Sequence, residues 1–356
     1  MSHTRVPRNI GIDLLRVFSI AMVVVGHAGS FPNDQLLTVW RMPLFFMLSG
    51  FFFTPGRSLT VEFSKRWNTL IIPYLAWSLI ISVWIIVTLW GQYGVIFDHL
   101  ESGWLGGSDQ SIYWMAAWFI TTLAGATILR RFLERFGSLI PWLVAIAGIV
   151  VSYILTEMVS NGTVDTHPLV DTPLRLGLAW PVMFYLLVGE LLRRLLMPLV
   201  KKFSSHVVAL IGLVLVGVAL YATVTFNLSA HFIQAGGFGT PVLTPLIAIM
   251  VTVGFILVFA TWVNDMLQKF RSPQAGVSRL VRTGTPVVFL HGLVLVWMYQ
   301  HGFGEDSLEH FLWRLSTAVV VSFLMALLIN STPIARLLSG APQEPNILRK
   351  RDDNPS

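Results

Sequence analysis

The sequence predicts an all-α polytopic membrane protein with about ten transmembrane helices. Of its 356 residues, 54% are hydrophobic and only 12% are charged, whereas roughly a quarter of the residues in an average soluble protein are charged. The apolar residues also form long runs, such as Leu210 to Ala222 and Val242 to Val263. These runs approach or reach the ~20 residues that a helix needs to cross a bilayer. So little charge cannot cover a water-exposed surface.

Ten apolar stretches, separated by polar or Gly- and Pro-rich breaks, define the expected spans. They are 12–30, 37–54, 70–90, 114–129, 139–157, 174–192, 206–226, 242–263, 284–300 and 313–330. Ten spans place both termini on the same side of the membrane. Because Arg5 and Arg8 precede the first span, the positive-inside rule assigns that side to the cytoplasm. The longest outer loops are then 91–113, 158–173 and 227–241.

The other basic residues agree with this topology. All but four of the 24 Lys and Arg lie on the cytoplasmic side of the expected spans. The exceptions are Arg16 in the first span and, at outer segments or span ends, Arg41, Arg175 and Arg314. The formal charge of +6 is therefore topological, which argues against nucleic-acid binding.

Several kinds of chemistry and processing are excluded. The chain has no Cys, which rules out disulfides, thiolate nucleophiles, iron–sulfur clusters and cysteine-ligated zinc, and we expect no metal site. The first span is not read as a cleavable signal peptide, because Asp13 and Arg16 interrupt its apolar region. A membrane domain over 1–332 is expected to precede a cytoplasmic tail over 333–356, a short amphipathic stretch followed by a largely disordered polar end.

The first span holds three ionisable residues, Asp13, Arg16 and His27. Such groups are costly in a spanning helix and usually serve a site in the bundle interior. Arg16 and His27 lie within ~20° on one helix face and ~16 Å apart, and Asp13 lies within ~40° of His27. We interpret His27 as a general base, since imidazole titrates near neutral pH. The alternative is that Asp13 and Arg16 anchor the helix end and His27 only hydrogen-bonds a neighbour.

The second and third spans supply further candidates. Ser49 and Gly50 form a small pair among aromatic residues, which favours close helix contact over a role for Ser49 as nucleophile or substrate donor. Lys65 and Arg66 lie at the cytoplasmic mouth of span three. They could bind lipid headgroups or a phosphate-bearing donor, or they could reflect the positive-inside bias alone.

Two later spans carry ionisable residues as well. Glu190 at the inner end of span six precedes Arg193 and Arg194, so a salt bridge on the helix surface is the default interpretation. His291 lies well inside span nine. It is either a site residue or a core histidine that satisfies a neighbouring polar group.

Together these residues resemble the acyltransferase 3 family of bacterial membrane O-acyltransferases. The first helix carries the strongest likeness, because Arg16, ten further residues and then His27 reproduce the family's basic-residue-to-histidine signature. The likeness continues over nearly the whole chain. It includes Met42-Pro-Leu-Phe-Phe, Ser49-Gly-Phe, the basic stretch before Ile72-Pro-Tyr, Trp118-Phe, Leu187-Val-Gly-Glu190 and Phe289-Leu-His291.

The resemblance implies a multi-pass enzyme of the bacterial inner membrane that transfers an acyl group other than an aminoacyl group. The group is most often acetyl, taken from cytoplasmic acyl-CoA and passed to a hydroxyl of a cell-envelope glycan or glycolipid. No bound cofactor is implied, because acyl-CoA is a substrate. His27 is the implied catalytic residue, Arg16 its basic companion and Asp13 the group that holds Arg16. The expected substrate-binding residues are Lys65, Arg66, Ser49, Glu190 and His291.

One departure from the family pattern concerns the donor. Many members have a second arginine three residues after the first in the basic stretch, where this chain has Thr69 after Arg66. Some members also carry an extracytoplasmic hydrolase-like domain, for which this chain is too short. We therefore expect the membrane domain to modify the acceptor itself, or a separate extracytoplasmic partner to take part.

Other mechanisms and functions stay open at this point. A covalent acyl intermediate on His27 or Ser49 is a less favoured alternative to direct transfer. A transporter or flippase for a glycan or lipid is the main alternative to an enzyme, because polar seams along spanning helices also mark substrate pathways. A sensory or scaffold membrane protein is a third class, in which His27 would be dispensable.

Overall fold

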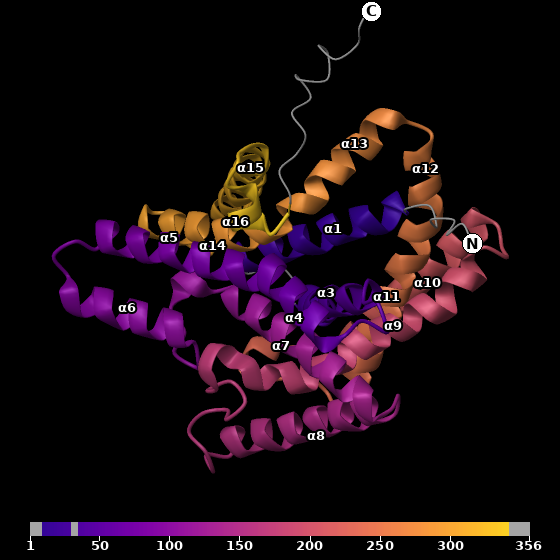
Figure 1. Ribbon diagram of the computed structural model, residues 1–356, viewed down its shortest axis with the longest axis horizontal. Coiled ribbons are helices and arrows are strands. Elements are labelled where there is room, and N and C mark those ends of the chain that lie inside the picture. Colours follow the sequence, from indigo (N-terminus) through magenta and orange to yellow (C-terminus); the bar gives the residue numbers. More distant parts are fainter. Residues whose placement is uncertain (1–8, 30–34, 342–356) are drawn as a thin grey trace, which may run out of the picture.

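The computed structural model describes residues 9–29 and 35–341, and all regular structure within these ranges is helical (Figure 1). This confirms the all-α prediction. The ten expected spans each fall on a helix. These are α1 (Ile10–His27), α3 (Arg41–Phe51), α5 (Ile72–Thr88), α7 (Ala117–Leu133), α8 (Ile140–Ser160), α9 (Ala179–Val200), α10 (Ser205–Thr225), α11 (Leu243–Val258), α14 (Gly284–Gln300) and α15 (Leu308–Ser331).

Within the described ranges, 7 helices are long and apolar enough to cross a membrane. They are Ile10–His27, Leu59–Thr88, Ile140–Ser160, Ser205–Thr225, Leu243–Gln268, Ser272–Gln300 and Leu308–Ser331. The other expected spans fall on α3 with 11 residues, α7 with 17 and α9, which carries Glu190, Arg193 and Arg194. The count of ten and the cytoplasmic side of the termini stay predictions, and Arg5 and Arg8 lie outside the described residues.

Shorter helices connect or extend the long ones. They are α2 (Gln35–Thr38), α4 (Leu59–Arg66), α6 (Tyr93–Leu105), α12 (Asn264–Gln268), α13 (Arg271–Leu280) and α16 (Ala335–Ser339). Helix α16 forms the start of the expected tail and packs on α5, where the Trp77 indole Nε1 donates to the Leu338 carbonyl at 2.9 Å. The rest of that tail, 342–356, lies outside the described residues.

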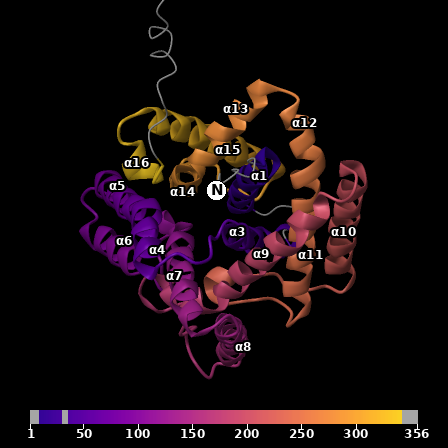
Figure 2. The same cartoon turned by 45° about the vertical axis from the view of Figure 1, so that its right-hand side comes forward.

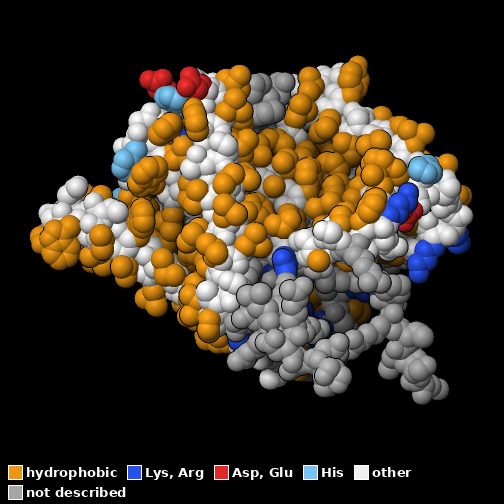
Figure 3. All heavy atoms as spheres, turned by 90° about the horizontal axis from the view of Figure 1, so that it is seen from above, with side chains coloured by type: hydrophobic (Ala, Val, Ile, Leu, Met, Phe, Trp, Pro, Cys, Tyr) orange, Lys and Arg blue, Asp and Glu red, His pale blue; other side chains and the backbone are white. Residues whose placement is uncertain are grey.

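The peripheral helices expose apolar side chains, as expected for a bundle that faces lipid. Helix α10 exposes Leu210, Leu213, Val214 and Val218, while its small residue Ala219 is fully buried. On the face shown in Figure 3, hydrophobic side chains cover most of the surface and most of the charged ones lie toward its edges. The low charge content therefore matches the surface that the fold exposes.

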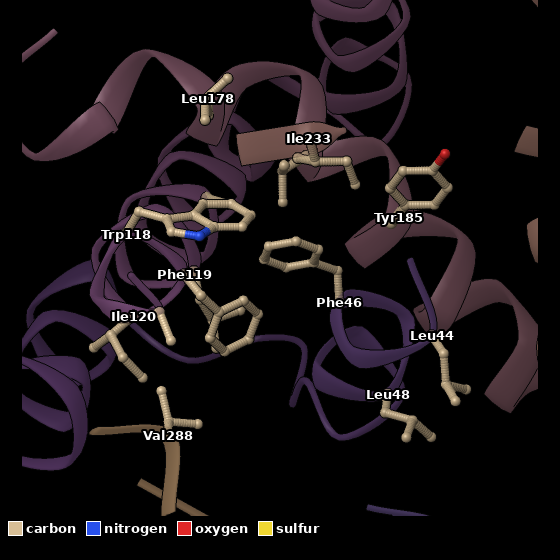
Figure 4. Packing of buried hydrophobic residues seen from close by; sticks show 14 of the residues in the cluster. Leu44, Phe46, Leu48, Trp118, Phe119, Ile120, Leu178, Tyr185, Ile233 and Val288 are labelled. Atoms are coloured by element: carbon tan, nitrogen blue, oxygen red, sulfur yellow. The ribbon is translucent and has the colours of Figure 1, made fainter. Parts of the chain in front are cut away.

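Helices α1 and α3 lie inside the ring formed by the other helices (Figure 2). Helix α3 crosses α9 closely, because a Cβ atom on Gly50 would lie 1.9 Å from the Leu186 carbonyl oxygen and one on Gly189 would lie 1.9 Å from that of Met47. The small residue after Ser49 thus allows close helix contact. Beside this crossing, Phe46 packs on Trp118 and Phe119 of α7 (Figure 4).

The bundle has two chemically different ends. We call one end the loop face, because residues 106–114, 158–178 and 227–241 meet there. We call the other end the basic face, which carries Lys65, Arg66, Arg193, Arg194 and Arg282. Helix α9 begins beside the 158–178 loop and ends at the basic face. Helix α1 runs the opposite way, so that His27 lies toward the loop face.

Candidate functional site

The site centres on two histidines that are distant in sequence. His27 is the last residue of α1, and His291 lies in the middle of α14. Nδ1 of His27 is 2.8 Å from Nε2 of His291, and the two ring planes differ by 4°. His291 is fully buried, and its Nδ1 lies 2.7 Å from the carbonyl oxygen of Val287. One ring is thus held by the other, and the second ring is held by backbone.

These contacts determine the proton positions when both rings are neutral. A carbonyl oxygen only accepts, so Nδ1 of His291 carries the hydrogen and its Nε2 is an acceptor. Nδ1 of His27 must then donate to that Nε2, which leaves the lone pair of His27 on Nε2. The pair therefore presents His27 Nε2 as a proton acceptor, and His291 fixes the orientation of the His27 ring.

Buried Arg314 of α15 fixes the end of α1 that bears His27. Its Nε donates to the Ala28 carbonyl at 2.6 Å, and its Nη1 donates to the carbonyls of Phe303 at 2.7 Å and Glu305 at 3.1 Å. Gly29 follows with φ of +130°, and a Cβ there would lie 2.5 Å from Arg314 Nη2. The sequence marked Arg314 only as a basic residue on the unexpected side.

His27 lines a cavity of about 210 Å³ toward the loop face. The cavity combines polar groups with an aromatic wall. Its lining includes His27, Arg41, His231 and Gln234, together with Met42, Phe45, Trp118 and Phe119. Arg41 lies against the last turn of α1, since a Cβ on Gly26 would come within 1.0 Å of its Nη1. A cation therefore lies beside His27 in this cavity.

A second cavity, of about 430 Å³, lies at the basic face. It brings together four cationic residues from three parts of the chain, Arg16, Lys65, Arg66 and Arg282, as well as several hydroxyl groups that include Ser49. Arg282 was not among the residues expected from sequence. Phe45, Phe119 and Val288 line both this cavity and the His27 cavity. The rings of Phe45 and Phe119 meet edge to face, with centroids 4.4 Å apart, so a thin aromatic partition separates the cavities.

Arg16 and His27 line different cavities, in keeping with their expected separation along α1. The Arg16 Nη1 atom is 4.0 Å from Asp13 Oδ1, and its guanidinium lies 4.8 Å from the centroid of the Phe52 ring. Asp13 is buried and lines a third cavity, of about 1000 Å³, together with Glu190. Arg16 thus belongs to the basic-face cavity and Asp13 lies behind it.

Ser49 faces the basic-face cavity rather than His27. Its hydroxyl donates to the Phe45 carbonyl one turn earlier at 3.0 Å. Such a bond within a helix satisfies the hydroxyl locally. This geometry favours a structural role for Ser49, or contact with a ligand, over nucleophilic attack.

Glu190 is buried, and its closest partner lies on another helix. Its two carboxylate oxygens accept from Nε and Nη2 of Arg130 on α7, both at 3.0 Å. The contact with Arg194 that the i, i+4 spacing indicates is present but longer, at 3.9 Å. A bidentate pair of this kind is both strong and directional. Glu190 therefore joins α9 to α7, a contact that local sequence could not reveal.

This pair is one end of a chain of buried and half-buried charges along the basic face. Arg130 lies 3.6 Å from Glu134, which is 2.5 Å from Arg131. Arg131 is 3.5 Å from Glu62, and fully buried Glu62 lies 2.7 Å from Arg66. The network thereby positions Arg66 at the wall of the basic-face cavity. Among the described residues, no three His, Asp or Glu side chains gather so that they could hold a metal ion.

A family model described as an acyltransferase domain matches residues 9–331. The chain belongs to the acyltransferase 3 family. No curated protein and no solved structure matches it. Family membership and the helical architecture together identify a membrane acyltransferase, and the multiple apolar helices indicate a multi-pass protein. In this acyltransferase 3 protein, the matched range includes the His27–His291 pair and the cationic residues that line the two cavities.

The Arg130–Glu190 pair gives a test of the structural network. Arg130→Met should lower the free energy of unfolding by about 3–5 kcal/mol, because it leaves a buried carboxylate uncompensated. The double variant Arg130→Met/Glu190→Leu removes both charges and should recover most of the loss. Thermal unfolding in nanodiscs, followed by tryptophan fluorescence, measures both effects. A single variant that melts like the wild type would contradict the pairing.

Proposed function

We propose that this acyltransferase 3 protein transfers a short acyl group, most simply acetyl, from cytoplasmic acyl-CoA to a hydroxyl of an envelope glycan or glycolipid. The observation that carries the proposal is the placement of the His27–His291 pair. His27 lines a small cavity toward the loop face, and a cationic cavity lies behind it toward the basic face. In this proposal the donor enters from the basic face and the acceptor from the loop face.

The basic-face cavity fits the phosphate groups of a CoA thioester. Lys and Arg side chains bind phosphate through charge-assisted hydrogen bonds. Lys65 and Arg282 line this cavity from two different segments of the chain, and we assign the direct phosphate contacts to them. Arg66 and Arg16 then complete the positive wall of the cavity. This assignment uses Arg282 in place of the second arginine that the basic stretch lacks.

The reaction can proceed by direct transfer. The acceptor hydroxyl gives its proton to His27 Nε2 as its oxygen attacks the thioester carbonyl carbon. The carbon–sulfur bond then breaks, and His27 returns the proton to the leaving thiolate, so that an ester and free CoA thiol are formed. His291 Nε2 accepts from His27 Nδ1 throughout and stabilises the imidazolium that forms between these two events.

Arg41 is the group best placed to stabilise the oxyanion. It shares the cavity with His27 and lies against the same turn of α1. Fixed positive charge near the carbonyl oxygen of a tetrahedral intermediate is a large source of catalysis. The cavity's volume of about 210 Å³ favours a short acyl group over a long chain. In this mechanism, the Phe45 and Phe119 side chains rotate to admit the thioester.

A transporter remains the second candidate, because two cavities separated by a thin partition also fit a substrate pathway. The two functions differ in what happens to the acyl group. An acyltransferase consumes the thioester and forms an ester on the acceptor. A transporter moves its substrate across the membrane with the thioester or ester intact.

Replacement of His27 tests the enzymatic function directly. His27→Ala should lower acyl transfer by about 10²- to 10⁴-fold, because it removes the general base. The assay is transfer of labelled acetyl from acetyl-CoA to acyl-depleted envelope carbohydrate and glycolipid by protein in nanodiscs. The control is His301→Ala, since His301 is exposed on the loop face and also bonds its own helix. Acetyl transfer at the wild-type rate by His27→Ala would overturn the assignment of His27 as the general base. Transport of a substrate without any acetyl transfer would favour the transporter.

Replacement of Arg282 tests the donor cavity. Arg282→Ala should raise the KM for acetyl-CoA by about tenfold or more with little change in kcat, because a hydrogen bond between charged groups is lost in binding. Steady-state kinetics with acetyl-CoA as the varied substrate measure this change. Lys269→Ala is the matched control, since exposed Lys269 lies on the same side but outside the cavity. Equal KM values for Arg282→Ala and the wild type would place the donor elsewhere.

A further inference from the structure

A polar cavity of about 510 Å³ lies at the loop face, outside the two cavities used so far. Segments from three loops form its wall. Its polar side chains include Ser108, Gln110, Asp165, Thr166, His167 and Gln234. Apolar side chains such as Ile112 and Val170 lie between them. The volume falls within the range of roughly 300–1,000 Å³ that is typical of small-molecule sites.

This loop-face cavity adjoins the His27 cavity. Gln234 lines both of them. Ala116 and Ile233 line the His27 cavity, whereas the nearby residues Met115 and Ala235 line the loop-face cavity. Only the thickness of a shared lining residue therefore separates a ligand in the loop-face cavity from the His27 cavity.

Arg175 fixes the shape of the loop-face cavity. Its Nε and Nη2 donate to the Gly107 carbonyl at 3.0 and 2.8 Å, and its Nη1 donates to the Gln234 carbonyl at 3.1 Å. One side chain thus ties together all three loops. Leu174 and Arg175 have φ of +57° and +55°, a conformation that is strained for residues other than glycine and that recurs at functional sites. Asp171 adds a further tie by accepting from the backbone N–H of Ser108 at 3.0 Å.

The charges around this cavity balance locally. Three contacts with backbone carbonyls occupy the guanidinium of Arg175. Burial raises the pKa of Asp171, but hydrogen bonds from Ser108 and Thr166 outweigh this and lower it overall. Asp171 is thus the ionised partner of Arg175.

The remaining lining of the cavity is largely uncharged. Burial lowers the pKa of His167, so its imidazole is neutral at pH 7. Nδ1 of His167 is buried and has no hydrogen-bond partner among the residues that the structure describes. Hydroxyl, amide and imidazole groups therefore converge on the cavity with a single further carboxylate, Asp165. Such groups both donate and accept hydrogen bonds.

We infer that the loop-face cavity is an acceptor subsite for an uncharged, hydroxyl-rich unit. This unit is a sugar or polyol next to the acceptor unit whose hydroxyl is acylated beside His27. Convergent donors and acceptors match hydroxyl groups, and the intervening apolar side chains match the faces of a sugar ring. An anionic unit fits poorly, because Asp165 would repel it and backbone carbonyls already engage Arg175. This inference rests on the proposed acyl transfer and adds where and how the acceptor is recognised.

Variants of the cavity test the subsite separately from the reaction. The double variant Gln110→Ala/Asp165→Asn should lower acetyl transfer to the neutral fraction of acyl-depleted envelope carbohydrate about tenfold or more, because hydrogen bonds to the acceptor are lost. Affinity for acetyl-CoA, measured by titration of the same protein in nanodiscs, should change less than about twofold. Asp109→Asn is the matched control, since Asp109 is an exposed acid in the same loop but outside the cavity.

A bulky substitution gives a second, independent measurement. Ala235→Trp should fill the cavity and reduce transfer while acetyl-CoA affinity is retained, which also shows that the protein is folded. If both variants transfer acetyl at the wild-type rate, the inferred subsite is refuted, while the proposed acyl transfer is not. Transfer by the wild type to the anionic fraction in preference to the neutral one would overturn the acceptor class. Absence of transfer by the wild type to either fraction would instead refute the proposed function.

Discussion

The hydrogen bond between His27 and His291 is the interaction on which the rest of the site depends. Two imidazoles inside an apolar bundle must find polar partners, because an unpaired buried polar group is costly. Here the two rings satisfy each other, and the Val287 carbonyl satisfies the outer nitrogen of His291. This arrangement requires the end of α1 to lie beside the middle of α14, and Arg314 holds the end of α1 in that position. The lone pair of neutral His27 is then on Nε2, the nitrogen that does not face His291.

Scarcity of charge explains why individual charged residues are informative in this protein. Positive-inside bias accounts for most Lys and Arg, but it does not account for the three on the loop side. Each of these has a specific place, with Arg41 beside His27, Arg175 between three loops and Arg314 at the end of α1. The three basic residues on the side that topology disfavours thus lie at the His27 cavity, between the loops around the loop-face cavity and at the end of α1.

Local sequence predicted the parts of the fold that depend on periodicity and composition. Apolar runs located the long helices, and helix geometry placed Arg16 away from His27. Small residues at Ser49-Gly50 indicated the close crossing of α3, for which Leu186 supplies the opposing backbone. Partners that meet only through tertiary packing were beyond the reach of this reasoning.

Two of those missed contacts involve candidate site residues. His27 meets His291 across 264 positions of sequence, and Glu190 takes Arg130 of α7 as its closest partner instead of its own helix neighbours. Arg282 reaches the basic-face cavity from a segment with no motif of its own. Periodicity identifies which residues share a helix face, but the pairing of faces follows from how the helices pack. Residue type was therefore a sound guide to candidates and a poor guide to their partners.

Nitrogen-15 NMR of the histidine imidazoles tests the central claim most directly. The protein would be labelled on its histidine nitrogens in nanodiscs, and the signals of His27 and His291 would be assigned by their loss in His27→Gln and His291→Gln. The account predicts that Nδ1 of His27 is protonated, that its Nε2 is not, and that a coupling across the hydrogen bond joins His27 Nδ1 to His291 Nε2. A protonated His27 Nε2 beside an unprotonated Nδ1 in the neutral ring would contradict it.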